Sequence, residues 1–214
     1  MTERTRSRRD DRAQTILDAA GAVLRRGGGR ALTIDAVAAQ AGLSKGGVLH
    51  HYASKDALIL ALVARKLTEL REGISACEAG SQPGPAGLAL AMVAHLREAY
   101  CEDDDFSRAL LIAAAENPEA LAGYRAFVAE RLERLESADP PGAGPMLFFA
   151  ILGLIMGRTL GFHDIGGAQA EALFGALERA AGALGQAAGA LGQAAGASGP
   201  ARRPGEEAPT GDAG

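Results

Sequence analysis

Apolar residues along this 214-residue chain recur mostly at spacings of three and four, which is typical of amphipathic helices. The clearest case lies within residues 33–52, where one helical stripe is formed by Ile34, Val37, Ala38 and Ala41. Thr33 can cap the start of this helix, and Gly42 can end it in a left-handed conformation. Ser44 can cap a second short helix that runs to about residue 52. The pattern predicts two short helices joined by a tight turn, which is a helix-turn-helix.

Similar stripes predict a longer helix before this motif and six after it. No segment alternates apolar and polar residues for long enough to indicate a strand. We therefore expect an all-α fold of about nine helices, with an N-terminal three-helix unit at residues 10–56 and a helical body at 57–184. The predicted helices outside the motif cover residues 10–26, 55–75, 86–100, 106–117, 118–137, 145–162 and 168–183.

The two ends of the chain lack such stripes. Residues 1–9 carry four arginines without apolar residues between them, so we expect a disordered basic arm that can add DNA contacts. Near the other end the chain repeats AGALGQA with a seven-residue period. Its glycines and alanines oppose a coiled coil. We expect residues 185–214 to be a low-complexity disordered tail.

The second helix of the motif has an unusual composition. Gly46 and Gly47 each cost about 1 kcal/mol relative to alanine inside a helix, so the absence of side chains there must serve another purpose. Close approach to a DNA surface is the simplest one. Lys45, His50 and His51 lie on the same outward side, which makes that side small, polar and basic.

Charge is distributed unevenly along the chain. The net charge is -4, but residues 1–56 contain ten Lys/Arg against six Asp/Glu, whereas the remainder contains twelve against twenty. Residues 1–56 thus carry +4 and the rest of the chain -8, which suits local docking on phosphates.

Other features point to a cytoplasmic protein. The arginine-rich start has no apolar segment behind it and so does not resemble a signal peptide. The longest apolar run, 146–157, is shorter than the roughly 20 residues that cross a bilayer. The cysteines, Cys77 and Cys101, are expected to be reduced thiols, although a redox switch stays open.

The signatures of common enzymes and metal sites are missing from the sequence. The glycines at 27–29 lack the lysine and hydroxyl residue of a phosphate-binding loop, and we find neither a nucleophile elbow nor a His-Glu-x-x-His motif. Adjacent His50 and His51 do not share a helix face, and the acidic run 102–105 lacks a metal-binding spacing. We expect no catalytic activity, no cofactor and no metal.

The segment AGLSKGGVLHHYASKDAL resembles the DNA-binding signature of the TetR family of bacterial transcriptional regulators, and the similarity extends over about residues 12–63. The resemblance implies a helix-turn-helix DNA-binding domain at 10–56. The residues themselves predict a phosphate site at Lys55, where the free backbone N–H groups of the next helix begin, and a half-buried Tyr52 whose hydroxyl is free to reach the DNA backbone. Leu49 stands where the family usually has a tyrosine. The expected DNA-contacting residues are Thr33, Ser44, Lys45, Gly46, Gly47, His50, His51, Tyr52 and Lys55.

The resemblance also implies a ligand-binding and dimerisation domain at 57–184. An unknown small-molecule effector would bind among its helices, and the plausible pocket residues are Met92, His95, Tyr124, Phe127, Phe148, Leu152 and Met156. Plain core packing is the alternative for each. The helix at 145–162 is apolar nearly all round and must be covered on more than one side. We therefore expect a homodimer interface formed by Phe149, Gly153, Gly157, Leu173 and Leu177.

Together these features predict a homodimeric DNA-binding transcriptional regulator. The leading hypothesis is a repressor that a small-molecule effector releases from a palindromic operator in double-stranded DNA. The alternative is a helical architectural DNA-binding protein without an effector. The two differ in the ratio of specific to non-specific DNA affinity.

Overall fold

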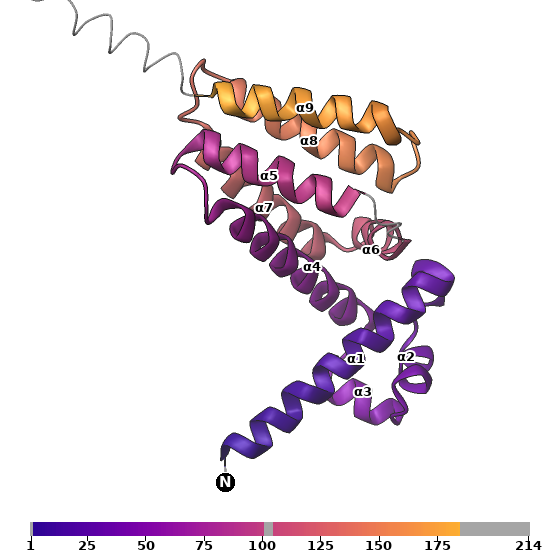
Figure 1. Cartoon of the computed structure of the whole chain (residues 1–214). Helices are drawn as coiled ribbons and strands as arrows, with labels where there is room; N and C mark the ends of the chain where they lie inside the picture. The colour runs from indigo at the N-terminus through magenta and orange to yellow at the C-terminus, as the bar shows by residue number, and fades with distance from the viewer. Residues whose placement is uncertain (1, 101–104, 185–214) are drawn as a thin grey trace, which may run out of the picture.

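The computed structural model describes residues 2–100 and 105–184, with side chains from Asp10 onward, and all regular secondary structure in these residues is helical. This confirms the predicted all-α fold (Figure 1). The helices of the described residues are α1 (Thr2–Ala31), α2 (Ile34–Ala41), α3 (Lys45–His51), α4 (Lys55–Glu78), α5 (Pro85–Tyr100), α6 (Asp105–Ala115), α7 (Pro118–Leu135), α8 (Ala143–Thr159) and α9 (Gly167–Ala183). The predicted tail at 185–214 lies outside the described residues.

Helix α1 differs from the sequence prediction at both ends. It begins at Thr2, so residues 2–9 are helical where a disordered arm was expected. Residues 2–9 contain no proline or glycine, the two residue types that most disfavour a helix, so α1 can include them. At the other end Gly28 adopts φ 67° and ψ -172°, which interrupts the helix inside the predicted glycine break, and one further turn reaches Ala31.

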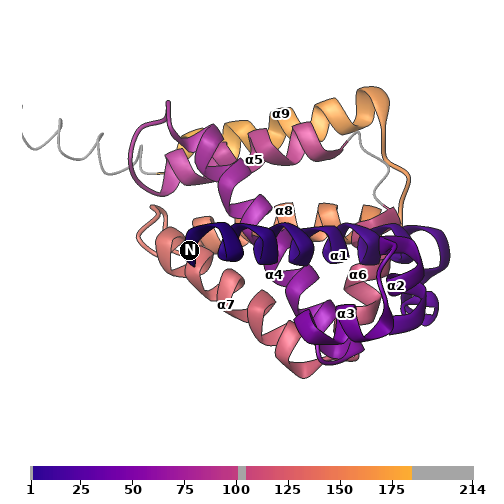
Figure 2. The ribbon, with the colours of Figure 1, turned by 90° about the horizontal axis from the view of Figure 1, so that it is seen from below.

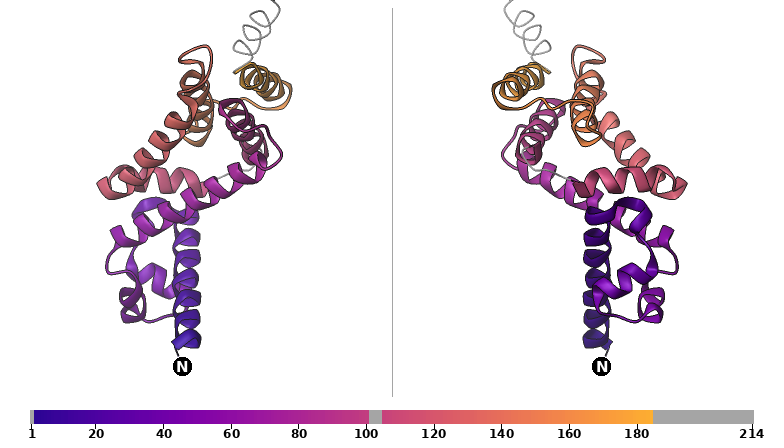
Figure 3. Two further views of the ribbon diagram at one scale, coloured as in Figure 1. Left: turned by 90° about the vertical axis from the view of Figure 1, so that its left-hand side faces the viewer. Right: turned by 90° about the vertical axis from the view of Figure 1, so that its right-hand side faces the viewer.

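The helices form two units joined by α4. Helices α1 to α3 lie at one end of the molecule, and α4 runs obliquely from them into the body, where α5 and α7 pack along it (Figures 1 and 3). Helices α8 and α9 lie at the end farthest from α1–α3. Helix α4 therefore connects the three helices α1–α3 to the rest of the protein.

One continuous hydrophobic core extends through both units, and alanine and leucine provide most of it. Small residues allow close helix packing at several points. Gly123 on α7 faces Leu67 on α4, where an added Cβ would lie 3.3 Å from the Leu67 side chain. The aromatic ring of Phe174, on α9, packs edge-on against Tyr100 of α5 at 5.1 Å, which fixes α9 against α5.

A membrane-spanning role finds no support in the described helices, since none of them is both long enough and apolar enough to cross a bilayer.

Candidate DNA interface

The helix-turn-helix forms through the local signals predicted for it. The Thr33 hydroxyl accepts a hydrogen bond from the backbone N–H of Ala36 at 3.1 Å, which caps α2. Gly42 ends α2 in the left-handed region at φ 66°. The Ser44 hydroxyl then accepts from the N–H of Gly47 at 3.1 Å and caps α3. The capping predictions are therefore confirmed.

Helix α3 presents a largely exposed outer face. Val48 is fully buried and anchors the helix to the core, whereas Lys45, Gly46 and His50 are exposed. A side chain added at Gly46 would meet no atom within 4 Å, so this glycine faces open space. Figure 2 looks at the molecule from the end where α1–α3 lie. A flat surface could therefore approach α3 closely at Gly46.

Two neighbours complete this face of α3. Leu49, which replaces the tyrosine usual in the family, is exposed by 39% beside His50. His51 is half-buried, and its ring packs edge-on against that of His50 at 5.4 Å. The sequence identified both histidines, but it gave no reason to expect an exposed leucine between polar residues. The face thus combines a lysine, a bare glycine, a leucine and an imidazole.

Lys45 is held at the edge of this face by an ion pair. Its Nζ lies 3.0 Å from Oδ2 of Asp35 on α2, and the two side chains are 59% and 70% exposed. An exposed pair of this kind contributes about 0–1 kcal/mol. Lys45 can therefore exchange the carboxylate for a DNA phosphate at small cost.

Lys55 makes a hydrogen bond within the protein. Its Nζ donates a hydrogen bond to the backbone carbonyl of Gly29 at 2.7 Å, and the side chain is half-buried. Gly29 follows the kink in α1, where a carbonyl lacks a regular helical partner. Lys55 thus links α1 to the start of α4, and its role as a phosphate anchor stays a prediction.

Tyr52 is half-buried, as expected, but its hydroxyl is turned inward. It donates to the backbone carbonyl of Ala13 on α1 at 3.4 Å. Burial raises the pKa of the Tyr52 hydroxyl, and the positive charge of Arg65 opposes part of this effect. The hydroxyl is thus engaged by α1, and its contact with the DNA backbone stays a prediction.

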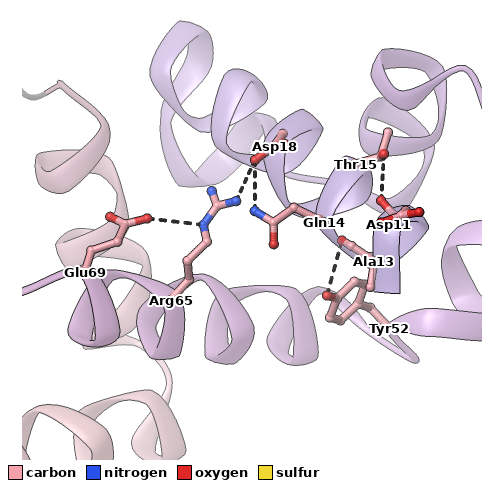
Figure 4. A network of polar contacts seen from close by, with 8 residues as sticks. All are labelled: Asp11, Ala13, Gln14, Thr15, Asp18, Tyr52, Arg65 and Glu69. Atoms are coloured by element: carbon pink, nitrogen blue, oxygen red, sulfur yellow. Dashed lines mark hydrogen bonds and ion pairs between the residues drawn. The ribbon is translucent and has the colours of Figure 1, made fainter. Parts of the chain in front are cut away.

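A network of polar side chains joins α1 to α4 (Figure 4). Arg65 of α4 donates to Oδ1 of Asp18 on α1 at 2.6 Å and lies 3.8 Å from Glu69 one turn further along α4. Gln14 donates to the same Asp18 oxygen at 3.4 Å. Sequence reasoning missed this contact. Spacing within one helix reveals the pair of Arg65 and Glu69, but not the partner 47 residues away.

The predicted effector-pocket residues are mostly part of the core. Met92, Phe127 and Phe148 are buried, and the other four are half-buried. The guanidinium groups of Arg71 and Arg131 lie 5.3 and 5.0 Å from the centre of the Phe127 ring.

Two cavities in the described structure lie elsewhere. One of about 270 Å³ lies between α1 and α6 and is lined in part by Arg25, Gly29 and Arg108. The other, of about 380 Å³, lies beside Asn117, where α7 begins. None of the seven predicted pocket residues lines either cavity, so the effector pocket stays a prediction.

The predicted interface residues do not all face outward. Phe149 on α8 is 53% exposed, Leu173 on α9 is 36% exposed, and a side chain at Gly153 would meet nothing within 4 Å. Leu177 is half-buried. Gly157 is buried, and a Cβ there would lie 2.7 Å from the His163 ring of the same chain. Gly157 therefore accommodates His163, and its role at a subunit interface stays a prediction.

Comparisons with known proteins agree with this architecture. Residues 16–62 match the model of bacterial regulatory proteins of the tetR family, and residues 86–182 match the tetracyclin repressor-like C-terminal domain. No curated protein matches the sequence.

Three solved structures illustrate the similarity. A TetR-family member from Streptomyces coelicolor A3 is 22% identical, with a TM-score of 0.64 over 79% of this chain and 97% of its own. The multidrug binding protein EbrR complexed with ethidium is 25% identical, with a TM-score of 0.60 over 79% and 97%. SmeT in its triclosan complex is 22% identical, with a TM-score of 0.55 over 70% and 81%. Both halves of the chain match the family models, and the chain belongs to the TetR family of bacterial transcriptional regulators.

Proposed function

We propose that this regulator is a homodimeric repressor that binds a palindromic operator and is released from it by a small-molecule effector. The observation that carries the proposal is the outer face of α3. Lys45, Gly46 and His50 are exposed there on a helix whose other side is anchored by the fully buried Val48. A short helix anchored in this way can enter the major groove of B-DNA.

The side chains of this face suit different parts of the duplex. Lys45 would exchange its ion pair with Asp35 for one with a DNA phosphate, and His50 would reach a base edge or a phosphate. Gly46 lets the DNA backbone approach closely. The exposed Leu49 side chain could make an apolar contact with the methyl group of a thymine. The capping hydroxyl of Ser44 accepts from a backbone N–H and retains its own proton to donate to a phosphate.

The exposed apolar surface of α8 and α9 supports the homodimer. Phe149 and Leu173 are exposed, and Met146, also on α8, is exposed by 70%. Burial of these side chains against the same surface of a second copy would be favourable, because burying a large apolar side chain contributes about 1.5–3 kcal/mol. In such a dimer the two α3 helices would read half-sites about 34–36 Å apart.

Ligands of the relatives support an effector. EbrR is seen with ethidium and SmeT with triclosan. For this chain we place the effector among α5–α8. Because Met92, Phe127 and Phe148 are buried in the core, entry of a ligand would require these side chains to repack. Such a ligand shifts DNA affinity only if it binds the two states with different affinity.

The test is operator binding by fluorescence anisotropy, with the DNA upstream of the protein's own gene and a scrambled duplex at equal salt. Lys45→Ala and His50→Ala should each weaken binding about tenfold, which corresponds to about 1.4 kcal/mol, and leave thermal stability nearly unchanged. Arg179→Ala is the matched control, because it removes one exposed charge on α9. Unchanged affinity in both α3 variants would refute the assignment of this face.

The same measurement addresses the architectural alternative. A repressor should prefer its operator over the scrambled duplex by at least about 10³-fold. A ratio near one would indicate an architectural DNA-binding protein instead.

A further inference from the structure

Three side chains with metal-binding chemistry meet at the packed pair of helices α4 and α5. They are Cys77 near the end of α4 and, three residues apart on α5, His95 and Glu98. One donor atom from each, the Cys77 sulfur, a ring nitrogen and a carboxylate oxygen, all lie within 4.8 Å of one another. Cys77 and His95 are half-buried, and Glu98 is exposed, so an ion could enter from the solvent side.

A glycine on α4 positions the imidazole of this group. An added Cβ at Gly73 would lie 2.3 Å from Cε1 and 2.6 Å from Nδ1 of His95, so the ring occupies space that any other residue would fill. Gly73 precedes Cys77 by four residues, which places both on the same face of α4. The missing side chain thus allows the His95 ring to lie next to the thiol.

We propose that Cys77, His95 and Glu98 bind one divalent transition-metal ion of the zinc type, with water in the fourth position. This site goes beyond the proposed function, which requires no metal. Thiolate, imidazole and carboxylate are the ligand types that Zn²⁺ takes in proteins, and three of them with a water form a familiar tetrahedral set. The sulfur disfavours Mg²⁺ and Ca²⁺, which prefer oxygen ligands.

The geometry requires only a small adjustment. Bond lengths of about 2.3 Å to sulfur and about 2.0–2.2 Å to nitrogen and oxygen place tetrahedral ligand atoms roughly 3.3–3.7 Å apart. Donor atoms within 4.8 Å must therefore close by up to about 1.5 Å. Cys77 and Glu98 can provide this by side-chain rotation, while His95 is held in place by Gly73.

Metal binding at this group should depend on pH. A thiol must lose its proton and an imidazole must be neutral before either binds a metal, so metal binding releases protons and metal affinity should rise with pH.

The sequence did not reveal this group because its members are spread over two helices. Cys77 and His95 are separated by 18 residues and a loop, and no short motif connects them. Only the packing of α4 against α5 brings them together.

Titration of the full-length protein with Co²⁺ tests the proposal, because a thiolate ligand gives a charge-transfer absorption band. In a Cys101→Ser background such a band can arise only from Cys77. We expect one Co²⁺ per chain, a thiolate band, and displacement of the ion by Zn²⁺. Cys77→Ser should abolish the band, and His95→Gln should weaken binding by at least about tenfold. Gly73→Ala should also weaken binding, although it removes no ligand.

A His50→Gln, His51→Gln double variant is the control, because it removes two other imidazoles on α3 and should bind Co²⁺ like the parent. Circular dichroism verifies that each variant is folded. If Cys77→Ser fails to fold, Glu98→Gln at an exposed position provides the second ligand variant. The absence of a thiolate band, or equal affinity in His95→Gln and the parent, would overturn the proposal. Because no DNA is present, neither result bears on operator binding.

Discussion

Replacement of Lys55 by methionine separates the two roles that sequence and structure assign to this lysine. In the structure its ammonium group donates to the Gly29 carbonyl at 2.7 Å and ties the start of α4 to the end of α1. The sequence instead predicts a phosphate anchor at the start of this helix. Methionine keeps most of the apolar stem and removes only the charge and the donor. The variant should therefore lose stability without losing a DNA contact.

The size of the loss follows from the environment of the bond. A hydrogen bond from a charged donor contributes about 1.5–3 kcal/mol, and a buried carbonyl left without a partner adds to the cost of losing it. Here the lysine is half-buried and Gly29 lines an open cleft of about 270 Å³, so water can replace the donor. We therefore expect a loss at or just below the lower limit of this range, about 1–1.5 kcal/mol. For a domain of this size that corresponds to a melting temperature lower by about 2–6 °C.

Two measurements on the Lys55→Met variant distinguish a structural role of Lys55 from a DNA contact. Urea unfolding followed by circular dichroism should show a lower midpoint at an unchanged slope. Anisotropy titrations of operator DNA at several salt concentrations should show an unchanged salt dependence, because each phosphate contact contributes about 0.9 to the logarithmic slope. Lys45→Met is the matched comparison and should behave in the opposite way, with normal stability and a slope reduced by about one. Normal stability with a reduced salt slope in Lys55→Met would refute the structural role.

Three further predictions concern other parts of the molecule. Gly157→Ala should lower stability by about 1 kcal/mol or more in urea unfolding, since its Cβ would lie 2.7 Å from the His163 ring; equal stability would contradict this packing. Burial raises the Tyr52 pKa, so the stability that its protonated hydroxyl contributes is complete below about pH 10 and is lost as pH rises through the folded pKa. Tyr52→Phe should flatten the decline in stability above about pH 10, and parallel curves would count against this reasoning. Phe149→Glu should convert a dimer to a folded monomer in sedimentation experiments, because the side chain is 53% exposed in one chain; a persistent dimer would place the interface elsewhere.

Much of the fold could be predicted because its signals are local. Thr33, Ser44 and Ser54 each cap a helix by accepting a hydrogen bond from a backbone N–H three residues later, so the sequence alone contains both partners. Gly42 likewise ends α2 through its own left-handed conformation. Helix existence and the turn between α2 and α3 depend on nothing farther away.

The direction of individual side chains could not be predicted, because distant residues determine it. Lys55 binds a carbonyl 26 residues away, and Tyr52 binds one 39 residues away. Both residues have the chemistry of DNA contacts, and the family resemblance favoured that role. Similarly, Gly157 fits the spacing of an interface, but His163 occupies the adjacent space. Residue type gives the chemistry of a side chain, while helix packing decides where that chemistry is used.

The inward direction of these residues has a consequence for how an effector could act. Tyr52 binds α1 from the end of α3, while Lys55 and Arg65 bind α1 from α4, so α1, α3 and the start of α4 are fastened to one another. A tilt of α4 should therefore move the three-helix unit as one body and alter the spacing of two such units in a dimer. An effector that weakens operator binding should leave amide hydrogen exchange in residues 34–51 unchanged. Faster exchange there would instead indicate that the effector unfolds the helix-turn-helix formed by α2 and α3.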